Sequence, residues 1–472
     1  MKQKGLTTFA LVMLITGAVD SIRNLPAASL FGSSLIFFFL FSAVVFLIPT
    51  ALVSAELSSE SDEKSGIFHW VREAFGEKMG FLAIWLQWIT NLVWFPTILS
   101  FIAGLVTYLI DPTLSQNKFI LVGIILAVFW ALTIVNLRGI KVSVKFTSFC
   151  AIVGMVIPMF LIIGLAFIWI LKGNPSHIHF TASNIFPTLS TTNTWISLTA
   201  IMTAFAGMEL AAVHVKDIQD PQKTFPRALY ISVWLIISTM LLGSLAIAIV
   251  LPATDISLVN GVMQAFTAFF HAYHIDWVIP IITAMILIGS LGGIISWVIS
   301  PAKGLLQAAQ LGYLPEFLQK ENSYGVAGNL LITQAVIVSI VCMAFLFMPS
   351  VSGSYWLLTA LSTQLYMLMY VMMFITGLYS HYKFAHRPRA FTIPGGHFGI
   401  WGTCIAGLIG CLITLIVGFF PPDGINVGSV YHYEMTFCGG MAAMILPILL
   451  FYAYKTKKKS SLQLSPVEVL LS

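Results

Sequence analysis

The stretch ITGAVDSIRNLPAASLFG, residues 15–32, decides how this chain can fold. It lies inside the first long apolar segment, yet it carries Asp20 and Arg23 at its middle. A charge at bilayer depth costs about 2.5–3.5 kcal/mol on insertion scales, so such residues are rare and usually face a cavity or a partner. Gly17 and Pro26 belong to the same stretch, and proline removes a backbone donor and clashes with the preceding helical turn. The stretch therefore predicts an interrupted transmembrane helix, with which many secondary transporters build a substrate site.

The composition of the whole chain places it in a membrane. Of its 472 residues, 58% are apolar and only 9% are charged, whereas soluble domains carry about 25% charged residues. A membrane-spanning helix needs about 20 apolar residues, and a barrel strand only about 9–11. Runs of helical length fall near residues 7–31, 33–55, 79–110, 119–137, 146–171, 193–215, 228–252, 277–300, 328–348, 354–381, 398–420 and 433–454. We therefore expect an all-α membrane protein with about twelve transmembrane helices.

The distribution of basic residues predicts the orientation. If the N-terminus is cytoplasmic, all but three of the 23 lysines and arginines lie in cytoplasmic segments. The three are Lys118 and Lys172 on the opposite side and Arg23 inside the membrane. Positive residues accumulate on the cytoplasmic side of membrane proteins, so both termini are expected in the cytoplasm. The net charge of +5 then needs no nucleic-acid partner.

A second interruption is predicted in the sixth span, TWISLTAIMTAFAGMELAAVHV, residues 194–215. Ala206 and Gly207 mark the candidate break, and Glu209 follows at membrane depth. Inverted repeats of five helices would place two broken helices at the first and sixth positions.

Two connections are expected to contain short helices. The cytoplasmic one, residues 58–78, has apolar residues at helical spacing, which predicts an amphipathic helix at the interface; they are Ile67, Trp70, Val71, Ala74 and Phe75. The outer one, residues 253–276, contains VNGVMQAFTAFFHAY, which is too short to span.

Two pairs of residues have both a structural and a functional interpretation. Gln87 and Asn91 share one face of the third span, where hydrogen bonding between helices is favoured over substrate contact. Tyr366 and Tyr370 in the tenth span are more typical of bundle core than of a substrate lid.

The sequence contains no HExxH, GxSxG or Walker motif, and its five cysteines are scattered without a CxxC. We therefore expect no enzymatic activity, no cofactor and no metal. The expected partners are a small-molecule substrate and the lipid bilayer, and the oligomeric state is left open, with a homodimer as one option.

Several segments resemble a known family. They are GLTTFALVMLITGAVDSIRNLP (5–26), FAGMELAAVHVKDIQDPQKTFPRA (205–228), SWVISPAKGL (296–305) and RAFTIPGG (389–396), together with NGVMQAFTAF (260–269) and FPPD (420–423). In these the chain is similar to the amino acid/polyamine/organocation superfamily, and most to its glutamate/γ-aminobutyrate antiporter group. The resemblance covers about residues 6–454.

The resemblance implies a LeuT-like fold with a 5+5 inverted repeat and two additional C-terminal helices. A single transporter domain would span residues 1–454, with helices 1–5 at about 6–171, helices 6–10 at about 193–381 and helices 11–12 at about 398–454. Residues 455–472, KTKKKSSLQLSPVEVLLS, would form a short basic cytoplasmic tail, disordered beyond its lysines.

The resemblance also implies a substrate site, in which exposed backbone of the two broken helices holds the carboxylate and the amine of an amino acid. Transferred by position, the substrate-binding residues are Gly17, Val19, Asp20, Ser21, Arg23, Thr203, Phe205, Ala206, Gly207, Trp297 and Tyr366. Glu209 matches an acid whose protonation is coupled to gating, and Asp20 is the second candidate for that role.

Asp20 and Arg23 allow two interpretations, because residues at i and i+3 share a helix face. In the structural one, slightly favoured, they form an internal ion pair that stabilises the break. In the functional one, Arg23 holds a substrate carboxylate or Asp20 receives the substrate ammonium. Glu209 is likewise either a proton switch or a hydrogen-bonded acid in helix packing.

The sequence thus predicts a secondary active amino-acid transporter that works by alternating access, of the glutamate/γ-aminobutyrate antiporter type, in a bacterial inner membrane. The alternatives are a proton-coupled symporter of neutral or cationic amino acids and a transporter-like amino-acid sensor.

Overall fold

The structure, a computed structural model, describes residues 8–60, 66–139, 144–186, 195–209, 220–306 and 308–464. These residues are almost entirely helical and contain no strand. Ten of their helices are long and apolar enough to cross a membrane by length and composition. The first and sixth predicted spans are not among the ten, because each is interrupted.

In the described residues the helices follow one another directly along the chain. The first part contains α1 (Thr8–Val19), α2 (Leu25–Ser29), α3 (Leu35–Ser42), α4 (Ile48–Glu60), α5 (Ile67–Phe75), α6 (Glu77–Ile110), α7 (Lys118–Leu137), α8 (Val144–Ala151), α9 (Ile157–Leu171) and α10 (Ala182–Ile185). The middle contains α12 (Ser197–Phe205), α14 (Pro221–Val250), α15 (Gly261–Ala272), α16 (Ile279–Leu306), α17 (Glu316–Gln319), α18 (Gly328–Cys342) and α19 (Ala344–Phe347). The last part contains α20 (Val351–Lys383), α21 (Gly396–Val417), α22 (Val430–Ile445) and α23 (Ile448–Leu464).

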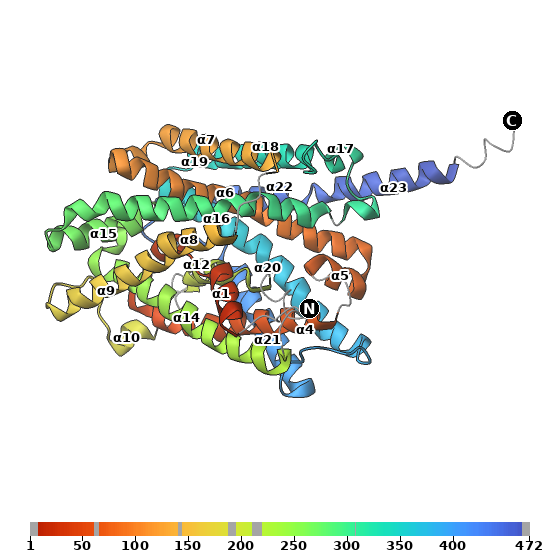
Figure 1. The fold of residues 1–472 in the computed structure, drawn as a ribbon, viewed down its shortest axis with the longest axis horizontal. Coiled ribbons are helices and arrows are strands. Elements are labelled where there is room, and N and C mark those ends of the chain that lie inside the picture. Colours follow the sequence, from red (N-terminus) through yellow and green to blue (C-terminus); the bar gives the residue numbers. More distant parts are fainter. Residues whose placement is uncertain are drawn as a thin grey trace.

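Most long helices run along the horizontal axis of Figure 1, which is therefore the direction of the expected membrane normal. Helices α7 and α18 lie side by side along one edge of the bundle, next to α6 and α16. Helices α1, α12 and α20 lie in the middle, and α14 and α21 lie on the side opposite to α7. In this view the two interrupted spans therefore lie between the α7 side and the α14 side of the bundle.

The first predicted break is present, and it lies between Gly17 and Pro26, the two residues on which the prediction rests. Helix α1 ends at Val19, and Ser21 is extended, with φ −156° and ψ 121°. A single 3₁₀ turn, η1 (Ile22–Asn24), then leads into α2. Pro26 lies in the first turn of α2, where its missing N–H has no helical partner to lose.

The second predicted break is present at the predicted residues. Helix α12 ends at Phe205, and Ala206 is extended, with φ −70° and ψ 147°. Gly207 follows with φ +107°, a backbone conformation that residues with a Cβ rarely adopt. The glycine is therefore what allows the chain to leave the helix at this depth.

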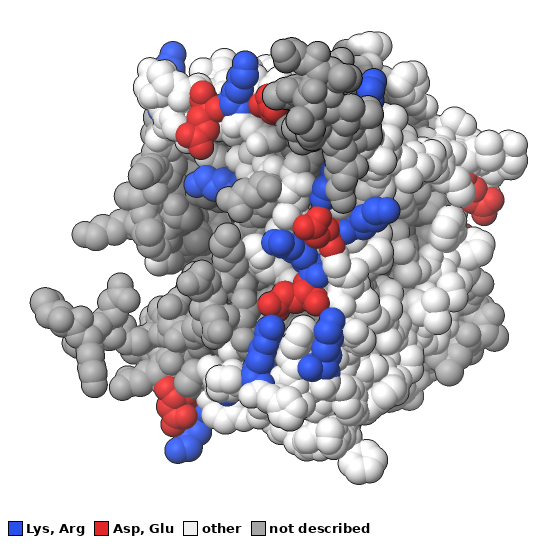
Figure 2. Space-filling model, turned by 90° about the vertical axis from the view of Figure 1, so that its right-hand side faces the viewer, with Lys and Arg blue, Asp and Glu red and all other residues white. Residues whose placement is uncertain are grey.

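The two predicted short helices are confirmed as α5 and α15. Helix α5 lies at the right-hand end of the bundle, with α17 and the projecting α23 (Figure 1). Seen from that end, Lys and Arg gather with Asp and Glu (Figure 2), and two of their ion pairs are Arg387–Glu73 and Lys455–Glu77. We call this end the basic face.

The C-terminal tail differs from the prediction in one respect: α23 continues past Tyr454 to Leu464. Lysine and leucine are good helix formers, so the helix need not end where the apolar run ends. The residues after Leu464 lie outside the described part of the chain.

Candidate functional site

A cavity of about 320 Å³ lies where the two breaks meet. This volume is in the range of small-molecule sites, which starts at about 300 Å³. Its walls come from the first break, from α6, α12, α16 and α20, and from the π-helical turn η5 (Ile152–Val156). The lining residues include Gly17, Val19, Asp20, Ser21, Arg23, Asn24, Thr90, Asn91, Trp94, Met155, Thr203, Ala206, Gly207, Ser290, Trp297, Thr363 and Tyr366.

Arg23 lies in the wall of this cavity and is held by two residues of α6. Its Nη1 donates to Thr97 Oγ1 at 3.2 Å, and its Cζ lies 4.8 Å from the centre of the Trp94 ring. A cation over an aromatic face is attracted by the ring quadrupole, and more strongly where water is excluded. The side chain is 5% exposed, and its buried Nε has no hydrogen-bond partner among the described residues. The guanidinium is therefore held in place by Thr97 and Trp94.

The partner of Asp20 lies on a different helix, α14. Thr239 of α14 donates its hydroxyl to Oδ2 of Asp20 at 2.8 Å. The other carboxyl oxygen, Oδ1, is buried and has no partner within the described structure. Asp20 is therefore held by α14, whereas Arg23 is held by α6.

The favoured prediction of an ion pair between Asp20 and Arg23 is wrong for this conformation, since none joins them in the described part of the chain. The i, i+3 argument requires a continuous helix. The break at Ser21 removes that geometry, so each charge finds a partner on another helix.

A second polar cluster connects the cavity to the second break. Tyr366 and Tyr370 of α20 donate their hydroxyl groups to Oε1 and Oε2 of Glu209, each at 2.5 Å. The Tyr370 hydroxyl also accepts the backbone N–H of Gly207 at 2.8 Å. Because Tyr366 lines the cavity and Glu209 does not, the tyrosine is the link between them. Thr203 and Thr363 add a hydroxyl contact between α12 and α20.

The remaining walls are aromatic or very closely packed. The Trp94 and Trp297 rings lie 5.7 Å apart, which covers the side of the cavity next to Arg23. On another side α16 passes η5 so closely that a Cβ placed on Gly154 would lie 2.3 Å from Cα of Gly289. π-Helical turns are frequent at functional sites.

The structure brings together most of the residues that the sequence predicted for the site. Phe205 is an exception, because its ring packs 5.6 Å from that of Phe39 and does not line the cavity. Glu209 lies behind Tyr366 rather than in the wall. Among the described residues, no group of three or more His, Cys, Asp or Glu side chains could hold a metal ion.

Sequence reasoning missed the residues that hold the charges in place, which are Trp94, Thr97 and Thr239. It also treated Tyr370 only as bundle core, although this residue joins Glu209 to Gly207. For Trp94 a signal existed, because Gln87, Asn91 and Trp94 follow one another at helical spacing on a single face of α6. A lone threonine such as Thr239 gives no such signal.

Comparisons with known proteins agree with this geometry. The family model described as "Amino acid permease" matches residues 6–442. An uncharacterized transporter of Legionella pneumophila is 40% identical over 449 residues, which cover 95% of this chain and 97% of that protein. A glutamate/gamma-aminobutyrate antiporter of Lactococcus lactis is 31% identical over 467 residues, covering 97% of this chain and 92% of the antiporter.

A solved structure shares the fold. The crystal structure of a manganese transporter of Eremococcus coleocola, in complex with an aromatic bis-isothiourea substituted compound, superposes with a TM-score of 0.58. The match covers 95% of this chain and 94% of that one at 13% sequence identity. At this identity the likeness shows the fold alone, and that fold is the expected LeuT-like arrangement.

Proposed function

The chain belongs to the amino acid permease family and is a multi-pass membrane transporter, and from this premise we propose that it exchanges amino acids across a bacterial inner membrane by alternating access. We propose further that it is an antiporter of the glutamate/γ-aminobutyrate type, as the relatives at 31% identity are. Its basic face would lie in the cytoplasm, since Lys and Arg are retained on that side.

One observation carries the proposal: the wall of the cavity at the two breaks contains charged residues of both signs, Asp20 and Arg23, which do not pair with each other. A buried charge without an ionic partner is costly, so a ligand that carries charges of both signs is favoured. Glutamate carries an ammonium, which is complementary to Asp20, and two carboxylates, one of which is complementary to Arg23.

The ends of the broken helices add a second set of contacts. The last carbonyl groups of α1 and the first N–H groups beyond the break have no intrahelical partners, and they carry partial charges of opposite sign. These groups would receive the α-amino and α-carboxylate groups of the substrate. Arg23 would then be available for a second carboxylate, which glutamate has and γ-aminobutyrate lacks.

Coupling would run through Tyr366 and Glu209. A substrate that displaces the Tyr366 hydroxyl from the cavity wall removes one of the two hydrogen bonds to Glu209. A change of protonation at Glu209 would disturb the same bonds from the other side. In either case the backbone of Gly207 is affected through Tyr370.

The proposal is tested by uptake of labelled glutamate into proteoliposomes preloaded with candidate amino acids, with and without an inward proton gradient. Uptake that requires an internal amino acid, γ-aminobutyrate in particular, is the expected result. Uptake into empty vesicles driven by the gradient would replace the antiporter with a proton-coupled symporter. Thermal stabilisation by glutamate without any uptake would instead indicate a sensor.

The role of Arg23 is tested by Arg23→Lys, with Arg387→Lys as the matched control. Lysine keeps the charge but loses the planar donor group that fits a carboxylate. We expect Arg23→Lys to lose glutamate uptake selectively, with γ-aminobutyrate exchange and purified yield retained. Arg387, which is half exposed and pairs with Glu73, should tolerate the change. A loss of yield with unchanged substrate preference would show that Arg23 has only a structural role.

A further inference from the structure

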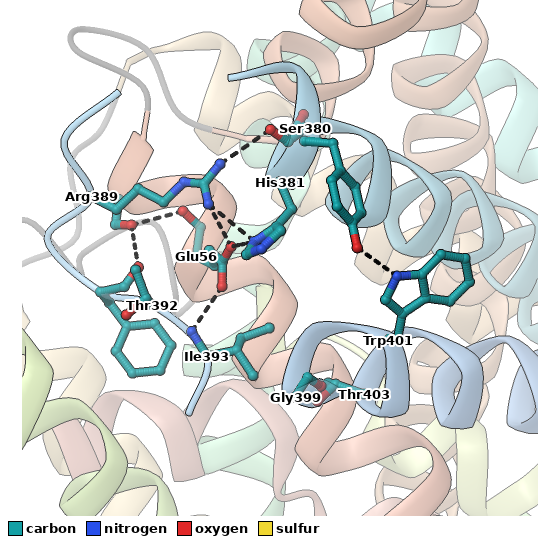
Figure 3. A network of polar contacts seen from close by, with 12 residues as sticks. Glu56, Ser380, His381, Arg389, Thr392, Ile393, Gly399, Trp401 and Thr403 are labelled. Atoms are coloured by element: carbon teal, nitrogen blue, oxygen red, sulfur yellow. Dashed lines mark hydrogen bonds and ion pairs between the residues drawn. The ribbon is translucent and has the colours of Figure 1, made fainter. Parts of the chain in front are cut away.

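Three carboxyl groups are buried in the described part of the chain, and the partners of the first one fix its charge. Glu56 of α4 accepts from Arg389 Nη1 at 3.0 Å and from the backbone N–H of Ile393 at 2.8 Å. Figure 3 shows these donors converging on the Glu56 carboxylate, which is 5% exposed. A guanidinium and a backbone N–H donate but do not accept. The cluster, which also includes His381, therefore holds Glu56 as a carboxylate.

The second buried carboxyl group, that of Glu209, accepts from two tyrosines. Its Oε1 and Oε2 receive the hydroxyl groups of Tyr366 and Tyr370. The Tyr370 hydroxyl also accepts the backbone N–H of Gly207 at 2.8 Å, so its own hydrogen is directed to Glu209. A proton on Oε2 would compete with that hydrogen for the same contact. The hydrogen bonds of Glu209 therefore also favour the ionised form.

The third buried carboxyl group, that of Asp20, has a partner that both donates and accepts. Thr239 Oγ1 lies 2.8 Å from Oδ2 of Asp20 and 2.8 Å from the carbonyl oxygen of Leu235 in its own helix, α14. A threonine hydroxyl has one hydrogen and two lone pairs. When Asp20 is ionised, the hydroxyl donates to Oδ2. When Asp20 is protonated, Oδ2 donates to the hydroxyl, and the hydroxyl hydrogen goes to Leu235. Asp20 thus keeps a hydrogen bond in either state.

The cavity wall around Asp20 contains few other ionisable groups. Arg23 is the other charged residue among the described lining residues, and it is held by α6. From α20, the Tyr366 hydroxyl lines the wall with Glu209 behind it, and the Tyr355 hydroxyl donates to the Arg23 carbonyl oxygen at 3.4 Å. The lining residues from α6, α8, α12, α16 and η5 have no ionisable side chain.

The helices on the other side of Asp20 add no charge near Thr239. Helix α14 packs against α1, α2 and α9, which contain no ionisable residue. The ionisable residues of α14 itself lie nine or more positions before Thr239. Of the other helices that pack against α14, α15 contributes His271, which is exposed and pairs with Asp276, and α4 contributes Glu56. Besides Thr239, the backbone N–H of Ser21 interacts with the Asp20 carboxyl group.

Without a substrate, an ionised Asp20 has no ionic partner among the described residues. A buried carboxylate in that position is costly, and protonation removes this cost. We propose that Asp20 binds a proton when the cavity is empty and exchanges it for the ammonium group of the substrate, with Thr239 as the positioning residue in both states. In this exchange the O–H bond of Asp20 breaks, its proton leaves to water, and the carboxylate pairs with the ammonium. The inference rests on the proposed function, because it requires that Asp20 receives the substrate ammonium.

The first consequence is competition between protons and substrate. Glutamate keeps its charges between about pH 5.5 and pH 7, whereas a protonated Asp20 has no negative charge for the ammonium. We expect the KM of glutamate exchange to rise by about fivefold or more when the pH is lowered across this range, with a smaller change in kcat. The glutamate concentration that half-maximally stabilises the purified protein against heat should rise in parallel. A KM and a stabilisation that are independent of pH would overturn the proposal.

The role of Thr239 is tested by Thr239→Val, which removes the hydroxyl with little change of shape. The ionised carboxyl group loses a stronger hydrogen bond than the neutral one loses. The pH at which the affinity for glutamate is half-maximal should therefore move up by about one unit. Thr239→Ser, which keeps the hydroxyl, should restore it. A purely structural role of Thr239 would lower the yield or kcat and leave this pH unchanged, and that result would overturn the proposal.

The matched control is Thr133→Val in α7. Thr133 is buried, and its hydroxyl donates to the carbonyl oxygen of Phe129 at 2.8 Å, as the Thr239 hydroxyl does to Leu235. It is bonded to no carboxyl group of the described residues, so the pH profile should match that of the unsubstituted protein. An equal shift in both valine variants would overturn the role of Thr239. A profile that moves in Tyr370→Phe and not in Thr239→Val would place the proton on Glu209 and would overturn the proposal as well.

A second measurement does not need transport activity. Glutamate added to the purified protein in weakly buffered solution should release protons, and the release should diminish at a pH well above that of half-maximal affinity. Binding without proton release at any pH would refute the proposal even if exchange is normal. Failure of the antiporter proposal is recognised separately, by the absence of exchange in the unmodified protein at every pH while glutamate still stabilises it.

Discussion

Replacing Tyr370 by phenylalanine should destabilise the second break more than the same change at Tyr366. The Tyr370 hydroxyl donates to Glu209 and accepts from Gly207, whereas the Tyr366 hydroxyl donates to Glu209 and accepts no backbone N–H among the described residues. A hydrogen bond to a charged group contributes about 1.5–3 kcal/mol and a neutral one about 0.5–1.5 kcal/mol. Bonds between membrane helices average nearer ~0.6 kcal/mol. We therefore expect losses of about 1–3 kcal/mol for Tyr366→Phe and about 2–4 kcal/mol for Tyr370→Phe.

The assay is reversible unfolding of the purified protein in mixed micelles with increasing dodecyl sulfate, which gives the free energy of unfolding for each variant. Tyr433→Phe is the control, because Tyr433 is fully buried and the hydrogen bond from its hydroxyl to the Gly418 carbonyl oxygen is long, at 3.5 Å. Its loss should stay below about 0.5 kcal/mol. Equal losses for Tyr366→Phe and Tyr370→Phe, within about 0.5 kcal/mol, would refute the reasoning, because the Gly207 N–H would then not depend on Tyr370.

Three further predictions follow from the geometry of the cavity. Trp94→Leu should weaken glutamate uptake by about tenfold, because Arg23 loses a buried cation–π contact of about 1–2 kcal/mol. Uptake of γ-aminobutyrate is measured for comparison, and an equal effect on both substrates would contradict this prediction. Gly207→Ala should slow exchange and lower the free energy of unfolding by about 1–2 kcal/mol, since φ +107° is unfavourable for alanine; an unchanged midpoint of unfolding would count against a strained break. Gly289→Ala should lower the free energy of unfolding by about 1–3 kcal/mol, because the added methyl group overpacks against Gly154. A free energy of unfolding equal to that of the unsubstituted protein would show that α16 can shift to make room.

The interruption of the two helices could be predicted because its causes are local. Pro26 and Gly207 act on the backbone of their own turn, and an ionisable group in an apolar run is visible in any window of the sequence. The position of the first break was less well determined. It falls at Ser21, between Gly17 and Pro26, because the packing of Asp20 against α14 also decides where α1 ends.

The partners of the charged groups could not be predicted from spacing. Asp20 and Arg23 satisfy the i, i+3 rule and still do not pair, because that rule assumes an unbroken helix. The cluster of Glu56, His381 and Arg389 was missed for a related reason. Glu56 and Arg389 are 333 residues apart in the sequence, and their contact exists only because α4 and α20 pack side by side.

By itself, the sequence determined the membrane class, the spans and the two breaks, since the bilayer makes the length and interruption of apolar runs decisive. The tertiary structure alone decided what each buried polar group binds. Thr97 lies 74 residues from Arg23 and Thr239 lies 219 residues from Asp20. A buried polar group must find a partner somewhere, but only the packing of the helices determines which residue that partner is.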